Sequence, residues 1–377
     1  MWVTLMKKIF ICFLFTILSS SIFAFNFGGT INNDFYAVGN SIKNFTAEES
    51  PSISFWFSTP LDFQGNTKIN FDISYDFSVL IPDSLTSHLI DINLLNITMK
   101  IPLSTSWYCD FVMGRRYFKD ITSFIYDDKI DCLAFDFAFS KAKMNFLAGY
   151  TGLLNIYSHN TYELSNPTIE NKLYSFSDSA ALLLDAQVKL DLAFPIKSIE
   201  YLSLTNLGNI AKNKVYLSLN AKNSLTDSLN YDITSSFLIR GNKKIANYTN
   251  AEIITSKGKN DISANLIFYS SENNILSSFE PYTINNKTES KLFSPGRVIL
   301  GGGFTHNIKK NTFFNGNAKM LFKLPTAENK ISYDGLFINL LFNIQAVSDF
   351  FINFGYEQFL SANNNNFSFF FCFELKY

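Results

Sequence analysis

The 377-residue sequence has few charged residues and no long apolar run in its main part. Lys, Arg, Asp and Glu make up 17% of the chain, whereas soluble domains average about 25%. A formal net charge of −1 and the lack of any basic tract argue against a nucleic-acid-binding surface. Because repeated apolar segments of about 20 residues are missing, a polytopic helical membrane protein is excluded.

Histidine and cysteine are also scarce, with three and four residues respectively. His88, His159 and His306 are too scattered to suggest a Ser–His pair, and the cysteine spacings match no zinc or redox motif. The sequence therefore predicts no enzyme, no metal site and no bound cofactor.

Aromatic residues, by contrast, are abundant. Phe occurs 41 times and Tyr 18 times, and aromatics form 16% of the chain. Such a composition excludes intrinsic disorder, since disordered chains are poor in aromatics. Mean hydropathy is nevertheless close to neutral, at +0.07, so polar residues must balance the aromatic ones.

The N-terminus is organised like an export signal. Lys7 and Lys8 precede an apolar stretch at residues 9–18, and small residues then lead to Ala24. The apolar stretch is too short to span a bilayer, and this order of charged, apolar and small residues is typical of a cleaved secretory signal. We expect residues 1–24 to be the signal peptide and residues 25–377 to form the folded protein.

Apolar and polar residues alternate along most of the remaining chain. The clearest stretch covers residues 68–79, where period-two alternation predicts a strand with one apolar and one polar face. Further examples cover residues 132–140, 182–194, 229–240, 314–324, 336–346, 350–356 and 367–377. Several of these are longer than the usual five or six residues of a soluble strand and suit a tilted strand that crosses a bilayer. Within lipid all backbone groups must be paired, so such strands must close into a barrel.

The connections between the predicted strands tend to alternate between short and long. Short ones are expected around Lys141 and at residues 195–198, 256–260, 307–311 and 347–349. Long ones are expected at residues 115–129, 152–178, 271–296 and 325–335. Transmembrane barrels show this asymmetry. We therefore predict an all-β, antiparallel transmembrane β-barrel of about 16–18 strands, with a phase slip near Leu94 and Leu95 that suggests a bulge.

The last strand resembles a known signal. Phe367, Phe369, Phe371, Phe373, Leu375 and Tyr377 share one face of residues 367–377. This alternating strand with a terminal aromatic residue resembles the C-terminal β-signal of bacterial outer-membrane barrels. A Gly114-Arg115-Arg116 strand end adds a weaker similarity, and the whole pattern resembles the porin-like class. The resemblance implies an outer-membrane location, contact with outer-membrane lipid, and recognition by the barrel-assembly machinery through Phe373, Leu375 and Tyr377.

The polar phase of the strands predicts the lining of the lumen. It contains seven basic and eight acidic side chains: Lys68, Lys143, Lys189, Arg240, Lys319, Lys323, Lys376, Asp72, Asp76, Asp136, Asp185, Asp191, Asp232, Glu357 and Glu374. Charges in this number need water or dense pairing, and a barrel of this size leaves an aqueous channel unless loops fill it. We expect passive diffusion of small hydrophilic solutes with weak overall ion selectivity.

Residues 115–129 form a charged segment with two open interpretations. It contains Arg115, Arg116, Lys119, Asp120, Asp127, Asp128 and Lys129. The segment follows the fifth predicted strand, where general porins fold a constriction loop inward, and charged rings at a constriction set selectivity. A solvated outer loop is the more common outcome for such a charge-rich connection.

An alternative function is a surface-exposed adhesin or a structural barrel without an open channel. The Asn- and Ser-rich connections at residues 152–178 and 271–296 could bind partners, and homo-oligomerisation stays open. Cys109 and Cys132 are expected near opposite ends of neighbouring strands, roughly 20 Å apart, which is too far for a disulfide.

Overall fold

The structure is a computed structural model. It describes residues 25–41, 44–81, 85–151, 180–192, 194–206, 212–240, 245–272, 276–283, 292–324, 331–361 and 365–376. The predicted signal peptide at residues 1–24, the whole of the long connection at residues 152–178 and the terminal Tyr377 lie outside these ranges. Within them, no helix is long and apolar enough to cross a bilayer.

Eighteen strands form one sheet. They are β1 (Asn26–Ser41), β2 (Asn44–Pro60), β3 (Thr67–Ile81), β4 (Leu85–Pro102), β5 (Tyr108–Lys119), β6 (Asp127–Ala138), β7 (Ala142–Tyr150), β8 (Ala181–Leu190), β9 (Ile196–Asn206), β10 (Lys214–Ser224), β11 (Leu229–Ile239), β12 (Ile245–Lys257), β13 (Asn260–Tyr269), β14 (Arg297–Lys309), β15 (Thr312–Lys323), β16 (Ser332–Val347), β17 (Phe350–Leu360) and β18 (Asn365–Lys376).

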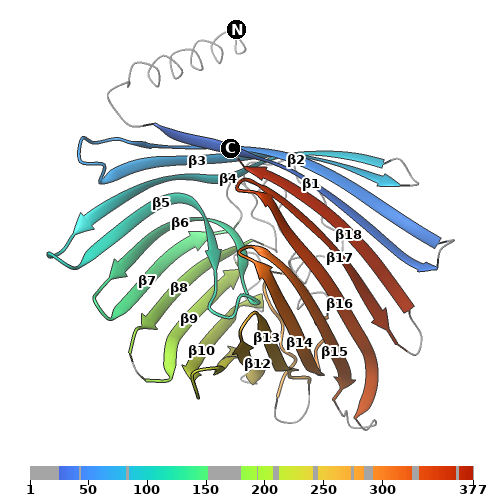
Figure 1. The fold of residues 1–377 in the computed structure, drawn as a ribbon. Coiled ribbons are helices and arrows are strands. Elements are labelled where there is room, and N and C mark those ends of the chain that lie inside the picture. Colours follow the sequence, from blue (N-terminus) through green and yellow to red (C-terminus); the bar gives the residue numbers. More distant parts are fainter. Residues whose placement is uncertain are drawn as a thin grey trace.

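Every strand pairs antiparallel with its sequence neighbours, and β1 pairs with both β2 and β18, which closes the sheet into a barrel (Figure 1). Closure leaves no free sheet edge. The fold predicted from alternation is therefore confirmed, and of the two strand numbers considered, the structure has eighteen.

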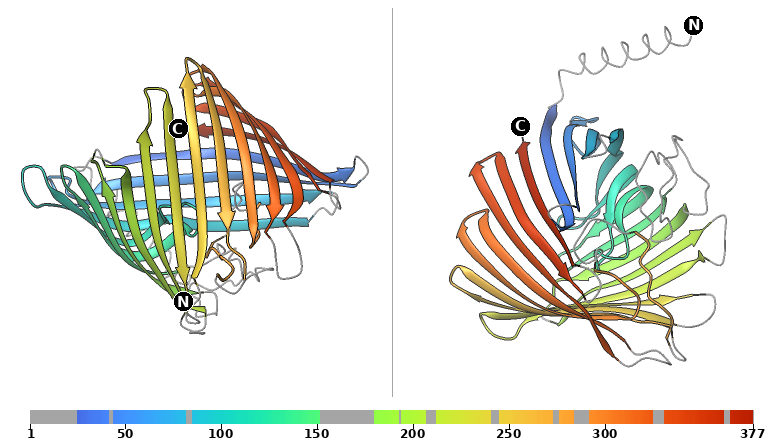
Figure 2. Two further views of the ribbon diagram at one scale, coloured as in Figure 1. Left: turned by 90° about the horizontal axis from the view of Figure 1, so that it is seen from below. Right: turned by 90° about the vertical axis from the view of Figure 1, so that its right-hand side faces the viewer.

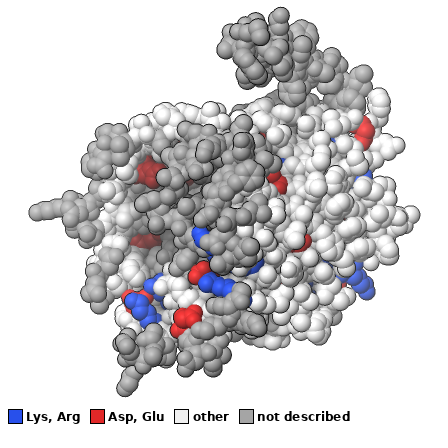
Figure 3. Space-filling view, turned by 180° about the vertical axis from the view of Figure 1, so that it is seen from behind, with Lys and Arg blue, Asp and Glu red and all other residues white. Residues whose placement is uncertain are grey.

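The two faces of the wall differ as the alternation requires. Large apolar side chains such as Leu133, Phe237 and Phe369 project from the outer face, each more than 40% exposed. Buried polar side chains such as Gln187, Glu200 and Ser218 occupy the opposite phase of their strands and face the interior. Figure 3 shows that charged side chains are sparse on the described surface seen there. An apolar outer face and a polar inner face are typical of a barrel that sits in lipid.

The connections also alternate in length. The end of the barrel that holds the start of β1 and the end of β18 has only short turns, such as residues 139–141 and 310–311; we call it the terminal end. The other end, which we call the loop end, carries the long connections at residues 151–180 and 270–296. Figure 2 shows the staggered strand ends from two further directions.

Two sequence predictions need correction at the level of boundaries. The strand expected at residues 182–194 ends at Leu190. Leu192 and Phe194 continue the apolar alternation in the sequence, but they lie in the exposed turn after the strand. The expected charged loop at residues 115–129 is mostly strand, since β5 runs to Lys119 and β6 begins at Asp127. The phase slip near Leu94 is confirmed as a register shift between β3 and β4.

Candidate functional site

The tips of β5 and β6 leave the barrel wall and fold into the interior. Pairing between β4 and β5 stops at Leu95 and Arg115, and pairing between β6 and β7 stops at Asp131 and Tyr150. Beyond these points β5 and β6 pair only with each other. Figure 1 shows both ribbons bending toward the barrel centre. We call residues 116–130 the inward hairpin.

Gly114 lies where the hairpin departs from the wall. Its φ angle is +120°, in a region that side-chain-bearing residues rarely adopt. A Cβ atom at this position would lie 2.3 Å from the backbone oxygen of Leu95. Glycine is therefore required here both by backbone conformation and by the close approach of β4.

A buried group of four charges surrounds this departure point. Arg115 donates two hydrogen bonds to Asp131, Nε to Oδ1 at 3.1 Å and Nη2 to Oδ2 at 2.9 Å. Its Nη1 atom lies 3.9 Å from Oδ1 of Asp91, and Lys129 also pairs with Asp91. Two cations thus balance two carboxylates, as burial of charge demands.

The tip of the inward hairpin is a tight turn organised by Asp120. Its Oδ1 atom accepts hydrogen bonds from the backbone N–H groups of Ile125 and Tyr126, at 3.1 and 3.0 Å. Its Oδ2 atom accepts the N–H and the hydroxyl of Thr122. Burial raises the pKa of Asp120 above its ordinary value, and these hydrogen bonds oppose that shift only in part.

Aromatic packing fixes the tip against the far wall. Phe124 is 4% exposed and contacts Tyr248 of β12 at a ring-centroid distance of 4.8 Å and Tyr269 of β13 at 5.4 Å. It also contacts Phe279 and Phe293 from the connection between β13 and β14. The tip is therefore the centre of an apolar cluster inside the barrel.

Residues 276–283 form a second segment that lies in the interior. The backbone N–H groups of Tyr282 and Thr283 donate to the oxygen of Ile125, at 2.9 and 3.0 Å. The ring of Tyr282 stacks on Tyr126. The hydroxyl of Thr283 accepts the N–H of Asp127 at 3.0 Å. The two segments thus support each other across the lumen.

Glu280 ties the second segment to the wall through charge. Its carboxylate pairs with Arg240, which follows β11, at 2.5 Å, and with Lys214 of β10 at 3.5 Å. Burial alone would raise the pKa of Glu280, but the two cations outweigh it and hold the pKa below its ordinary value. The ion pairs therefore anchor this segment as long as Glu280 is ionised.

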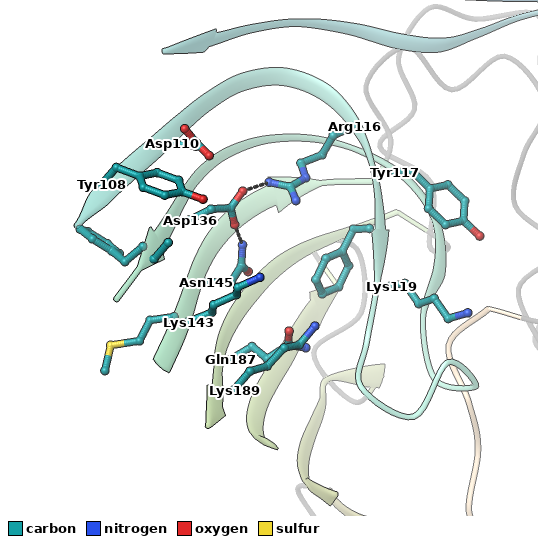
Figure 4. A pocket seen from close by; sticks show the side chains of 14 residues that line it. Tyr108, Asp110, Arg116, Tyr117, Lys119, Asp136, Lys143, Asn145, Gln187 and Lys189 are labelled. Atoms are coloured by element: carbon teal, nitrogen blue, oxygen red, sulfur yellow. Dashed lines mark hydrogen bonds and ion pairs between the residues drawn. The ribbon is translucent and has the colours of Figure 1, made fainter. Parts of the chain in front are cut away.

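A cavity of about 320 Å³ lies between the hairpin and the inner faces of β5–β8, toward the terminal end. Arg116 pairs with Asp136 at 2.9 Å, and Asn145 lies beside the same carboxylate (Figure 4). Lys143 and Lys189 line the cavity from directly opposite positions on β7 and β8. Around the cavity, the cations Arg116, Lys119, Lys143 and Lys189 outnumber the carboxylates Asp110 and Asp136, so the cavity has a local excess of positive charge.

A second cavity of about 500 Å³ lies at the loop end. Tyr36 of β1, Phe337 of β16 and Glu357 of β17 line it. On β2 and β3, inward residues such as Ser54 and Asp72 remain partly exposed. The inward segments therefore narrow the lumen on the β8–β15 side and leave space on the other.

The structure places the predicted lining residues in several environments. Those on strands and in the inward phase are Lys68, Asp72, Asp76, Asp136, Lys143, Asp185, Lys189, Asp232, Lys319, Lys323, Glu357, Glu374 and Lys376. Asp191 lies in the turn after β8 rather than on a strand, and Arg240 follows the end of β11. Lys323 pairs with Asp334 at 2.8 Å. Asp185 and Lys319 are buried by their surroundings.

The charged segment also divides. Arg115 forms its ion pair with Asp131 where the hairpin leaves the wall. Arg116 lines the terminal-end cavity, and Asp120 organises the turn at the tip. Asp127 pairs with Lys119 at 3.7 Å. Asp128 is the second residue of β6, and its carboxylate accepts the backbone N–H of Lys129. The tip of the segment is buried inside the barrel, so its position is that of an inward loop and not of a solvated outer loop.

Sequence reasoning missed the residues that hold the hairpin in place. They are apolar or neutral: Phe124, Ile125 and Tyr126 at the tip, and Tyr248 and Tyr269 on the wall. The signal was the apolar run at residues 124–126 inside a charged connection, since a solvated loop would not need three large apolar residues. Cys109 and Cys132 are both buried and free. Among the described residues, no three His, Cys, Asp or Glu side chains converge on a metal position.

These features define a closed 18-stranded antiparallel barrel whose lumen is narrowed by two inward segments. No family model matches the sequence, and no curated protein does. Solved structures do match by fold. OccK5 (OpdH) of Pseudomonas aeruginosa aligns with a TM-score of 0.60 at 10% identity, over 93% of this chain and 98% of that one.

Two further structures give similar values. The outer membrane protein OprD from P. aeruginosa has a TM-score of 0.60 at 8% identity, over 94% of this chain and 93% of its own. OccAB4 of Acinetobacter baumannii has a TM-score of 0.61 at 10% identity, over 94% and 98%. The alignments span nearly the whole barrel, and at these identities they show a shared fold.

Proposed function

We propose that the protein is an outer-membrane, porin-like channel through which small hydrophilic solutes diffuse passively. The observation that carries the proposal is the divided interior. The inward hairpin and residues 276–283 narrow the lumen from one side, and cavities of about 320 and 500 Å³ lie on either side of them. A loop-narrowed barrel of this size with charged walls is the arrangement that selects among solutes by size and charge.

The similarity to known structures supports this proposal. OprD is described as an outer membrane protein, and OccK2 (OpdF) of P. aeruginosa was solved in complex with glucuronate, an anionic sugar acid. The excess of cations at the terminal-end cavity, in particular Lys143 and Lys189, favours passage of anions at that point, within a lumen whose overall charge is nearly balanced.

Export and membrane contacts form part of the same proposal. The signal at residues 1–24 would direct export, and the apolar outer face would contact outer-membrane lipid. Phe373 and Leu375 lie on β18, where they and the following Tyr377 would be read by the barrel-assembly machinery. Self-association of barrels through the outer face is compatible with this account.

One of the two connections that could act as an adhesive loop lies partly inside the barrel, which weakens the adhesin alternative. Residues 276–283 lie inside the barrel against Ile125 and Tyr126, so this part of the connection is not presented to outside partners. A purely structural barrel would need no partly exposed polar wall along β2 and β3.

Liposome swelling tests the proposal. Vesicles that contain the purified, folded protein should swell in solutions of small sugars, and the rate should fall steeply as solute size increases. Vesicles that swell no faster than protein-free ones would refute the channel function.

A further inference from the structure

Three buried carboxyl groups meet where the tip of the inward hairpin contacts the wall. Asp120 belongs to the tip, Asp185 to β8 and Glu200 to β9, and they are 2%, 4% and 1% exposed. None of the three has an ion-pair partner among the described residues. This differs from the departure point and from Glu280, where each buried carboxylate has a cation.

Glu200 holds the tip directly. The backbone N–H of Ile121 donates to both of its oxygens, Oε1 at 3.3 Å and Oε2 at 3.1 Å. Gln187 also donates to Oε1, at 3.0 Å. This contact joins residues 79 positions apart in the sequence, so it attaches the hairpin to a strand with which it does not pair.

Asp185 lies beside Glu200 without a donor of its own. Gln187 is directly opposite Glu200 across β8 and β9, and Asp185 is two residues from Gln187 on the same face. Such diagonal neighbours are within reach of long side chains. Neither oxygen of Asp185 receives a hydrogen bond from a donor of the described residues, so the available polar neighbour is another carboxyl group.

The surroundings do not supply a full compensating charge. Arg116 of the hairpin pairs with Asp136 instead, and among the described residues Lys189 of β8 forms no ion pair with Asp185. Tyr126 and Tyr216 are the buried phenols nearby, and Asn145, Gln187 and Ser218, which flank the site on β7, β8 and β10, do not titrate. Isolated buried carboxylates carry a large desolvation penalty, and adjacent carboxyl groups relieve it by sharing a proton.

We propose that Asp185, Glu200 and Asp120 form a proton-binding cluster that latches the inward hairpin to the barrel wall. With one proton shared between Asp185 and Glu200, Asp185 donates to Glu200, and Glu200 still accepts the N–H groups of Ile121 and Gln187. The ligand in this proposal is a proton; among the described residues, no three His, Cys, Asp or Glu side chains are placed to hold a metal ion.

The sign of the pH effect follows from proton binding. The latched state holds a proton that water-exposed carboxyl groups, with pKa values of about 4, would lose. Acid therefore favours the latch. The latch weakens by about tenfold per pH unit for each proton released as the pH rises from about 4, the pKa of the unlatched carboxyl groups, to the pKa of the latched cluster. Once the proton leaves, repulsion between two carboxylates separates Glu200 from the tip.

This inference rests on the proposed channel for its first readout. In planar bilayers, single channels of the full-length mature protein should have a steady current at about pH 4, near the ordinary carboxyl pKa. Transitions between sublevels should become more frequent toward neutral and alkaline pH. The double variant D185N/E200Q keeps amide donors and acceptors and removes the two carboxyl groups that share the proton, leaving Asp120 with its own backbone donors. Its current should therefore be steady across the range in which the wild type changes. E200A removes the acceptor of Ile121 and should be unsteady at every pH.

D261N is the matched control. Asp261 is an inward carboxyl group at the terminal end of β13, far from the hairpin along the strand ladder. The D261N substitution also removes a carboxyl group from the interior, but away from the cluster. This variant should therefore keep the pH dependence of the wild-type current. A wild-type current with the same sublevel frequency at all pH values, or a D185N/E200Q variant that titrates like the wild type, would overturn the proposal.

A second readout does not require conduction. Hydrogen–deuterium exchange of the peptide that contains Ile121, corrected for the intrinsic pH dependence of exchange, should accelerate with pH in the wild type and not in D185N/E200Q. If no channels form but this difference is found, the channel function fails and the latch stands. Equal corrected exchange in both proteins at all pH values would reject the latch.

Discussion

Phe124→Ala tests whether aromatic packing keeps the inward hairpin across the lumen. The side chain is 4% exposed and contacts four aromatic rings, with centroid distances of 4.8 Å to Tyr248, 5.4 Å to Tyr269, 6.3 Å to Phe279 and 5.5 Å to Phe293. Truncation of a buried Phe to Ala costs about 3–5 kcal/mol. Because the barrel wall does not depend on this ring, we expect most of the loss to affect the docking of the tip.

A loss of about 3 kcal/mol changes the ratio of docked to undocked hairpin more than a hundredfold. Single-channel recording should therefore detect a larger or more variable conductance in F124A, and larger polyethylene glycols should enter the channel. Phe63→Ala is the control, because Phe63 lies in a turn at the terminal end and is 87% exposed. If F124A and F63A both keep the conductance and size cut-off of the wild type, the hairpin does not form the constriction.

Three further substitutions probe other parts of the site. Gly114→Ala forces a Cβ atom into the backbone of β4 and should lower the free energy of unfolding by about 1–3 kcal/mol, measured as a lower midpoint of heat-induced unfolding on gels. Gly258→Ala is the control, because Gly258 lies in an open turn with φ +63°, and it should lower the midpoint less. Equal losses in the two variants would contradict the steric argument. Arg116→Ala removes a cation from the terminal-end cavity and should shift the reversal potential in a salt gradient toward cation preference; an unchanged potential would remove that cavity from the permeation path. Glu280→Gln should lower the thermal unfolding midpoint at pH 7. Since the pKa of Glu280 lies below 4.5, the difference from wild type should persist above pH 4.5 and vanish as the pH falls through that lowered pKa; a difference that persists in acid would refute the ion-pair explanation.

The barrel was predictable because the pattern that produces it, the alternation of apolar and polar residues, is visible between neighbours in the sequence. Alternation in residues such as Ile69, Phe71 and Ile73, with polar residues between them, directly reports a wall with lipid on one face and water on the other. Long strands and asymmetric connections followed from the same pattern. Even the slip near Leu94 was visible, because a bulge changes the phase of the side chains.

The inward hairpin was not predictable from the same signal. Residues 116–119 and 127–130 keep strand conformation after they leave the wall, so periodicity does not report the departure. The charges of this segment left a constriction loop and a solvated outer loop both open, because the sequence does not show that Arg115 is neutralised by Asp131, a residue 16 positions later. The contacts that hold the tip join Ile121 to Glu200 and Phe124 to Tyr248, and such distant partners are fixed only by the closed barrel.

The most direct test of the account is single-channel conductance of the purified wild-type protein in a planar bilayer with graded polyethylene glycols. A lumen narrowed by the inward hairpin should give discrete conductance steps, admit small polymers and exclude larger ones at the constriction. A folded, inserted barrel that produces no conductance steps would contradict the central claim that its lumen is a passage for small solutes.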